Sequence, residues 1–456
     1  MNNHKSAKLS LTTKLAYGIG EVGLVMPVSI AIFFLLYFLT EVAGLSPTLA
    51  GTVLLIGTGW DAVSDPLIGW LSDRTRTRWG RRFPWMIGGG IPLILCCTLQ
   101  WWVPPFASQR GLFAYYCLLS ILVYASYTAV VLPFTALAAE LATDYDERTA
   151  MMGFKSGFNT VGSILGLVVA QAVFMAVAAP QQQYLTIGIL TSAGVLIGIA
   201  VCVWGTQQRY WQQQKKIVVA QPALTQSLWT DLLSVLTNQP FRWLLGLYLG
   251  AWIGTQVAAA MLPYFISSWM QLAEQAFTQM AIAIQGAAVV SLPVWMGVTR
   301  ATSKRTTFFL GAPLTLLALL GLITVQPGQV VRMYVLAAIS GVGLATFYLV
   351  PFAMLPDVID IDAVQTGQRR EGLFFSCLVF CQKLGSAIAL FTIGYLLDRA
   401  NFVTSDGTPH VEQTASALWT IRLLISVLPA LLIAISLYFA YRYPLRRTVT
   451  TFPDNT

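Results

Sequence analysis

Long apolar blocks recur along the whole chain and constrain its fold more than any other feature. Each block holds about 20 residues or more, the length that an α-helix needs to cross the hydrocarbon core of a bilayer. Of the 456 residues, 56% are hydrophobic and 10% are charged, whereas an average soluble domain has about 25% charged residues. The sequence therefore predicts an all-α membrane protein and excludes a water-soluble one.

Twelve such blocks can be delimited as candidate membrane spans. They are residues 14–43, 46–72, 83–103, 112–139, 149–178, 184–204, 241–272, 276–298, 307–325, 331–355, 373–397 and 415–441. The longest interruption, at residues 205–240, separates six spans from six. We therefore expect two six-helix halves, residues 1–204 and 241–456, joined by a central cytoplasmic loop at residues 205–240. A proline, a glycine and a basic run occur in this order at residues 66–82 and again at residues 293–305, as related halves of a carrier would show.

The Lys and Arg residues are distributed unevenly between the loops. If the N-terminus is cytoplasmic, loops on that side hold 21 of the 27 Lys and Arg residues, and the opposite loops hold three, Arg110, Arg332 and Arg399. An excess of Lys and Arg marks the cytoplasmic loops of membrane proteins. The net charge of +8 is thus explained by topology, with both termini in the cytoplasm, and it predicts no nucleic-acid partner.

Asp61 and Asp65 are the most informative polar residues inside the spans. A charged side chain at the centre of a membrane helix costs about 2.5–3.5 kcal/mol on insertion scales, so its presence requires an explanation. The two acids are four residues apart and project from one face of a helix, about one turn from each other. A monovalent cation between them is the simplest way to relieve their repulsion, because carboxylate and hydroxyl oxygens suit hard cations. Ser64 lies beside the pair and is a further candidate ligand.

Two other interpretations of the acid pair remain open. The acids can pair with a lysine of another helix and hold the bundle together. Lys383 is the best candidate, because it lies ten residues into the eleventh span, about 15 Å from its cytoplasmic end; it can also replace the cation or contact a solute. Paired aspartates also bind Mg²⁺ in lipid enzymes, but such enzymes need more converging acids, so we expect no enzyme.

Charged residues also gather at the cytoplasmic ends of the spans. Acids at residues 357–362, followed by Arg369 and Arg370, are expected to form a charged loop between the tenth and eleventh spans. Together with charges near the second to fifth spans, they predict salt bridges that latch one conformation, and solvated loop charge is the alternative. The residues assigned to cytoplasmic gating are Asp73, Arg74, Glu140, Arg148, Asp357, Asp360 and Arg370.

Four sequence windows together resemble one known family. They are residues 17–21 (Tyr-Gly-Ile-Gly-Glu), 60–81, 132–149 and 357–383. Over residues 12 to 400 the chain resembles the glycoside–pentoside–hexuronide:cation symporters of the major facilitator superfamily, which include the melibiose permeases. The resemblance implies a multi-pass carrier of the cell membrane that works by alternating access. We expect it to act as a monomer on a small solute and a monovalent cation among membrane lipids, without a cofactor.

The resemblance also implies roles for individual residues. In that family the acid pair of the second span binds Na⁺, Li⁺ or H⁺, and a threonine of the fourth span, here Thr128, joins the site. The family's lysine of the eleventh span matches Lys383. A sugar-contacting arginine of the fifth span falls on Lys155, which keeps the charge but loses the bidentate fork. The candidate solute contacts are Lys383, Lys155, Thr135 and Gln382.

The chain departs from the melibiose permeases at the sugar site. Two acids that grip the sugar there would align with Val25 and Val131, and a tryptophan with Thr135. Melibiose is therefore not the expected substrate, and we predict a glycoside or a related polar organic solute coupled to Na⁺ or H⁺. Residues 353–360 also resemble sodium-dependent lysophospholipid carriers, so a lysophospholipid is the alternative substrate. A scaffold or regulator that has kept the fold without transport is a third possibility.

Overall fold

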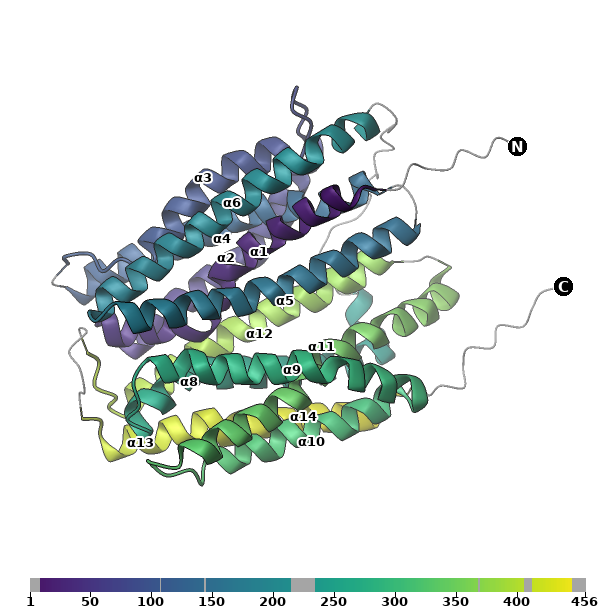
Figure 1. Ribbon diagram of the computed structural model, residues 1–456. Coiled ribbons are helices and arrows are strands. Elements are labelled where there is room, and N and C mark those ends of the chain that lie inside the picture. The colour runs from purple at the N-terminus through teal and green to yellow at the C-terminus, as the bar shows by residue number, and fades with distance from the viewer. Residues whose placement is uncertain are drawn as a thin grey trace, which may run out of the picture. The chain divides into compact units, whose positions relative to one another are not determined.

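The described part of the chain is helical throughout. The computed structural model describes residues 9–106, 108–142, 145–214, 234–367, 370–405 and 412–444, and all regular elements in these ranges are helices (Figure 1). Ten of the described helical segments are both long and apolar enough to cross a membrane, and one further apolar helix is shorter. The prediction of an all-α membrane protein is thereby confirmed. The helix with the acid pair is not among these ten segments, so the count of twelve spans stays a prediction.

The helices form two compact units, which are described separately. The first comprises Met1–Gln221 and Leu390–Glu412, and the second Pro222–Ala389 and Gln413–Thr456. The helices of the first unit are α1 (Leu11–Tyr37) with the π-helix η1 (Phe38–Val42), α2 (Pro47–Arg74), α3 (Phe83–Leu99), α4 (Gln109–Leu141), α5 (Tyr145–Ala176) and α6 (Pro180–Gln214). Those of the second are α8 (Gln239–Tyr264) with the π-helix η2 (Phe265–Trp269), α9 (Gln275–Ala301), α10 (Lys304–Leu322), α11 (Val330–Thr366), α12 (Glu371–Arg399), α13 (Ala415–Arg422), η3 (Leu423–Val427) and α14 (Leu428–Arg442). From Leu390 onward, α12 belongs to the first unit.

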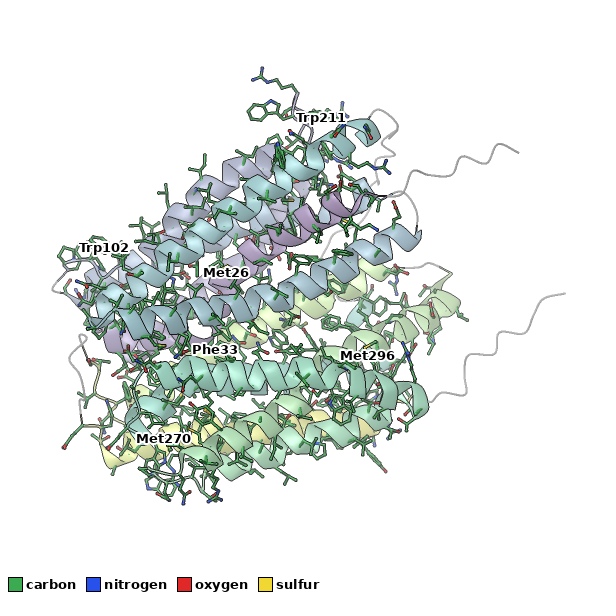
Figure 2. All side chains as sticks on the ribbon, in the orientation of Figure 1. Met26, Phe33, Trp102, Trp211, Met270 and Met296 are labelled. Carbon is green, nitrogen blue, oxygen red and sulfur yellow. The ribbon has the colours of Figure 1, made fainter. Side chains whose placement is uncertain are left out.

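In the first unit, α1 lies between α5 and α6 (Figure 1). Glycines allow this close packing: a Cβ atom at Gly23 would overlap the carbonyl oxygen of Gly194 in α6, and one at Gly162 in α5 would lie 2.8 Å from the Cα atom of Val22. Met26 of α1, labelled in Figure 2, also packs against Gly194 of α6. Three polar side chains of α1, Thr13, Glu21 and Ser29, are buried.

Helix α4 packs against both α1 and α2. The ring of Tyr17 in α1 stacks on the ring of Phe134 in α4, with centroids 4.4 Å apart and planes 1° from parallel. On the side of α2, a Cβ atom at Gly57 would overlap the hydroxyl oxygen of Ser120 in α4. The absence of a side chain at Gly57 therefore lets α4 approach α2 one turn before Asp61.

Each unit contains a first helix that ends in the same way. The carbonyl oxygen of the first π-helical residue, Phe38 in one unit and Phe265 in the other, accepts a hydrogen bond from the N–H five residues later, at 2.9 Å in both. In each unit the backbone then turns at a residue with positive φ, Gly44 at 70° in the first and Gln271 at 54° in the second. The shared pattern supports an internal repeat, with Met270 closing the second π-helix (Figure 2).

The same spacing relates the following helices. The two π-helices start 227 residues apart, and the prolines inside α2 and α9, Pro66 and Pro293, are separated by the same number. This register places Ala288 and Leu292 of α9 at the positions of the two acids of α2. The second unit therefore carries no copy of the acid pair at the related positions.

One predicted loop is wrong. The helix α11 continues to Thr366, so Asp357, Asp360 and Asp362 lie on a helix and not in a loop between spans. With 37 residues, α11 is about 55 Å long, whereas the hydrocarbon core is about 30 Å thick. The apolar pattern ends before the helix does, and Gly367, at φ 71°, provides the left-handed residue that ends it. The sixth helix likewise continues beyond the end of its predicted span.

Candidate functional site

Helices α2 and α4 bring three of the predicted cation ligands together. The hydroxyl oxygen of Thr128 lies 2.9 Å from Oδ1 of Asp61 and 3.1 Å from Oδ1 of Asp65. Thr128 and Asp61 are buried, at 0% and 5% exposed, and Asp65 is half-buried. Because a threonine hydroxyl carries a single hydrogen, it donates to one carboxylate at a time. Two carboxylates and one hydroxyl thus converge within one unit.

The other predicted ligand, Ser64, is turned toward its own helix. Its hydroxyl donates a hydrogen bond of 3.2 Å to the carbonyl oxygen of Asp61, and the side chain is buried. Pro66 lies inside α2 and lacks the N–H that would otherwise bond the carbonyl oxygen of Ala62. The hydroxyl of Thr128 and the carbonyl oxygen of Ala62 thus add oxygen atoms beside the two carboxylates, and oxygen ligands suit a hard cation such as Na⁺.

The candidate solute contacts fall in two places. In the first unit, Nζ of Lys155 on α5 donates a hydrogen bond of 3.0 Å to the hydroxyl oxygen of Thr135 on α4. In the second unit, the hydroxyl of Tyr248 donates a hydrogen bond of 2.5 Å to Oε1 of Gln382 on α12, and Lys383, the next residue, is half-buried. The structure thus pairs Lys155 with Thr135, and Gln382 with Tyr248 of α8, whose ring packs against that of Trp252.

Sequence reasoning assigned no role to Glu21, which the structure places in the interior of the first unit. Its side chain is 4% exposed, and its Oε1 atom accepts a hydrogen bond of 2.7 Å from Nδ2 of Asn159 on α5. The available signal was its charge inside an apolar span, which by itself marks a candidate functional residue. Its hydrogen-bond partner, Asn159, is 138 residues away, so nothing in the sequence indicates that the two side chains meet.

Two predicted gating residues of the first unit, Asp73 and Glu140, belong to a charged network at the ends of α2 and α4. Oε1 of Glu140 lies 2.6 Å from Nε of Arg82 and 2.9 Å from an Nη atom of Arg81. Arg82 also pairs with Asp73 at 2.7 Å. Glu140 and Arg82 are buried, whereas the side chain of Asp73 is 64% exposed. Arg82 is therefore held by a buried acid on one side and a solvated acid on the other.

In the second unit, Arg370 pairs with Asp362. The guanidinium donates to both carboxylate oxygens of Asp362, at 3.0 and 2.7 Å, in the bidentate geometry that arginine favours. Lys304 holds Asp357 at 2.8 Å. Burial raises the pKa of the Tyr443 phenol well above its usual range, and the charge of Asp357 adds to the shift.

The remaining gating candidates have other surroundings. The guanidinium of Arg74 lies over the ring of Trp70, 4.0 Å from its centroid. Asp360 is exposed on α11. The side chain of Arg148, on α5, lies outside the described residues. Of the predicted gating residues, Glu140, Asp73, Asp357 and Arg370 thus form ion pairs within their own units.

Comparison with known proteins places the whole chain in one family. The model of the MFS/sugar transport protein family matches residues 16–447. An uncharacterized symporter of Synechocystis sp. is 37% identical, over 97% of this chain and 96% of the relative. YagG of Escherichia coli, which carries the name of a glycoside/cation symporter, is 29% identical over 94% and 90%. A sodium-dependent lysophosphatidylcholine symporter of Danio rerio is 27% identical over 96% and 86%.

Solved structures of transporters share the fold. The inward-open xylose transporter XylE of E. coli superposes with a TM-score of 0.65 at 12% identity, covering 96% of this chain and 97% of that one. A bacterial homologue of the iron transporter ferroportin, in an inward-facing state, gives a TM-score of 0.68 at 14% identity, covering 96% and 100%. The predicted family of cation symporters within the major facilitator superfamily is confirmed by these comparisons. The chain therefore belongs to the MFS/sugar transport protein family and is a membrane transporter.

Proposed function

We propose that this transporter couples the entry of a monovalent cation, Na⁺ in the first place, to the uptake of a glycoside or related polar organic solute. The observation that carries the proposal is the hydroxyl of Thr128 within hydrogen-bond distance of both Asp61 and Asp65. Oxygen ligands on two packed helices form a cation site of the type that hard cations prefer. A transporter that binds Na⁺ there gains about 2.3 kcal/mol for each charge that moves inward across 100 mV.

The relatives support cation coupling. Two of those reported carry the words symporter and cation or sodium in their names, and both are matched over at least 94% of this chain. In the proposed cycle, the cation neutralises the repulsion of the two carboxylates, and closure of the transporter around the solute follows. H⁺ is the alternative coupling ion, because either carboxylate can be neutralised by a proton instead.

The proposed topology has twelve membrane spans. They include α2 and α3 in addition to the ten segments that meet the criteria of length and apolarity. We assign residues 1–204 and 241–456 to two six-helix halves and place both termini on the cytoplasmic side of the cell membrane, following the distribution of Lys and Arg. The protein acts as a monomer, with lipid around its apolar helices. The buried Glu140 network and the Arg370–Asp362 pair then lie on the cytoplasmic side and act as latches.

Solute binding is assigned to two groups of side chains. Lys155 and Thr135 supply an ammonium group and a hydroxyl in the first unit, and Gln382 and Lys383 supply an amide and an ammonium group in the second. Such groups pair with the hydroxyls of a glycoside. A lysophospholipid is the second candidate, because symporters of lysophosphatidylcholine are about as similar to this chain as YagG is.

Uptake into proteoliposomes tests the proposal. An inward Na⁺ gradient is imposed on vesicles that contain the purified chain, and the uptake of radiolabelled methyl glycosides and of lysophosphatidylcholine is measured. We expect uphill uptake of a methyl glycoside that requires the gradient and is abolished in Asp61→Asn and Asp65→Asn. Glu412→Gln, which removes an exposed acid, is the control and should transport as the wild type does. Gradient-driven uptake that survives in both Asp variants would contradict the cation assignment. Uptake of lysophosphatidylcholine without uptake of any methyl glycoside would show that the substrate is a lysophospholipid and not a glycoside.

A further inference from the structure

A second polar cluster lies where α1, α4 and α5 meet. Glu21 is buried, and its Oε1 atom is bonded to Asn159. Its Oε2 atom is buried and has no hydrogen-bond partner among the described residues. The hydroxyl of Tyr17, one turn earlier on α1, is likewise buried without a hydrogen bond in the described part of the chain. Leaving such groups unsatisfied costs about 1–3 kcal/mol each, and more for a charged group, so a ligand that bonds to them would stabilise the cluster.

A lysine of opposite charge faces this cluster without closing it. The charge of Lys155 acts on Glu21, but Nζ of Lys155 bonds to Thr135 at 3.0 Å. Within the described residues, no ion pair of 4.0 Å or less joins Lys155 to Glu21. The carboxylate of Glu21 and the ammonium group of Lys155 are thus each bonded to a neutral side chain of another helix, Asn159 and Thr135 respectively. This arrangement is suited to a molecule that bonds to both.

The surrounding groups favour a hydroxyl-bearing molecule. The bare carboxylate oxygen accepts an O–H donor, while the amide of Asn159 and the hydroxyls of Thr135 and Tyr17 bond neutral polar groups. A quaternary ammonium group is recognised instead by aromatic faces, and one face of the Tyr17 ring is covered by Phe134, with centroids 4.4 Å apart. A phosphate would rely on a single lysine. The cluster therefore fits vicinal hydroxyls of a sugar better than a phosphocholine head group.

The cluster is also linked to the acid pair of α2. Thr128 and Thr135 are seven residues apart, which places them on one face of α4 about 10 Å from each other along the axis. Tyr127 on the same helix lies within electrostatic range of Glu21, Asp61 and Asp65. One residue of each cluster, Thr128 and Thr135, thus stands on the same helix.

We propose that Glu21, held by Asn159, is a solute-binding residue whose bare carboxylate oxygen accepts hydroxyl groups of a sugar that Lys155 binds from the other side. The proposal rests on the function proposed above and adds a residue and a ligand class to it. Glu21 lies in the same unit as the acid pair, so the proposed cation site and the proposed sugar-binding carboxylate belong to one unit.

The experiment measures the binding of two kinds of probe to the purified full chain in sodium, by isothermal titration calorimetry. One kind is methyl glycosides of glucose, galactose and xylose, and the other is glycerophosphocholine, the water-soluble head group of a lysophospholipid. We expect a methyl glycoside to bind and Glu21→Gln to weaken its affinity about 10-fold or more, because a hydrogen bond to a charged acceptor is lost. Asn159→Ala, which releases the carboxylate, is the second variant and should weaken the affinity about three-fold through loss of one neutral hydrogen bond.

Two controls separate this inference from the proposed function. Glu41→Gln removes the half-buried carboxylate of η1, which also has an oxygen without a partner, and should leave glycoside affinity unchanged. The affinity of Glu21→Gln for ²²Na⁺ should remain within about two-fold of the wild type, whereas Asp61→Asn should lose ²²Na⁺ binding. A wrong assignment of the sugar site and a wrong assignment of the cation site therefore give different results. Unchanged glycoside affinity in both cluster variants would overturn the role of Glu21. Binding of glycerophosphocholine only, or of neither probe, would overturn the ligand class.

Discussion

The hydroxyl of Thr128 is the residue-scale feature on which the cation site depends. It lies between two carboxylates of α2, at 2.9 and 3.1 Å, and it is fully buried. With its hydrogen directed to one carboxylate, its lone pairs remain available to a cation held by the other. Helical spacing alone predicted that the two acids share one face. The threonine followed only from a family resemblance, because a threonine in an apolar span gives no signal of its own.

Replacing Thr128 tests this arrangement. In Thr128→Val the shape of the side chain is kept and one ligand oxygen is lost, so we expect ²²Na⁺ affinity to fall about 10- to 100-fold, by the 1.5–3 kcal/mol of a charge-assisted contact. Equilibrium binding to the purified protein measures it. The control is Thr191→Val, because Thr191 is also buried and its hydroxyl bonds only to carbonyl oxygens of its own helix. Equal Na⁺ affinity in the two variants would mean that Thr128 is no ligand.

At the scale of elements, glycines decide how the helices pack. Apolar blocks in the sequence predicted where helices occur, but not that Gly23 and Gly194 allow α1 and α6 to meet at their backbones. Helix ends were predicted least well: α11 continues through an acidic segment that hydropathy assigns to a loop. The π-helices η1 and η2 were not predicted either, since no residue pattern at Phe38 or Phe265 distinguishes them from α-helix.

The packing of α1 predicts a sharp contrast between two glycines. Gly23→Ala places a methyl group on the carbonyl oxygen of Gly194 and should lower the free energy of unfolding by about 1–3 kcal/mol, as overpacking does. Gly88→Ala in α3 meets no atom within 4 Å and should leave stability equal or higher, because alanine favours a helix over glycine by about 1 kcal/mol. Thermal unfolding midpoints in detergent compare them. A Gly23→Ala midpoint at or above that of Gly88→Ala would contradict the packing argument.

At the scale of the whole molecule, the two units share a pattern but differ in chemistry. Both contain a first helix that ends in a π-helix and a following helix with an internal proline. Only the first unit has acids at the related positions of α2, since Ala288 and Leu292 stand there in α9. A structural repeat with one cation site is what a carrier of two related halves requires if a single site drives transport. Each unit also contains a buried acid in an ion pair with an arginine of the same unit, Glu140 with Arg82 and Asp362 with Arg370.

Cation binding by the acid pair is the basis of the proposed coupling, and binding of ²²Na⁺ to the purified, reconstituted chain measures it. We predict saturable binding in the wild type, its loss in Asp61→Asn, and tighter binding when a transported methyl glycoside is present, because coupling between two ligands is reciprocal. Absence of saturable Na⁺ binding across the pH range, or equal binding in the wild type and Asp61→Asn, would contradict a sodium site at the acid pair. The two carboxylates would then bind protons or serve only to pack the helices.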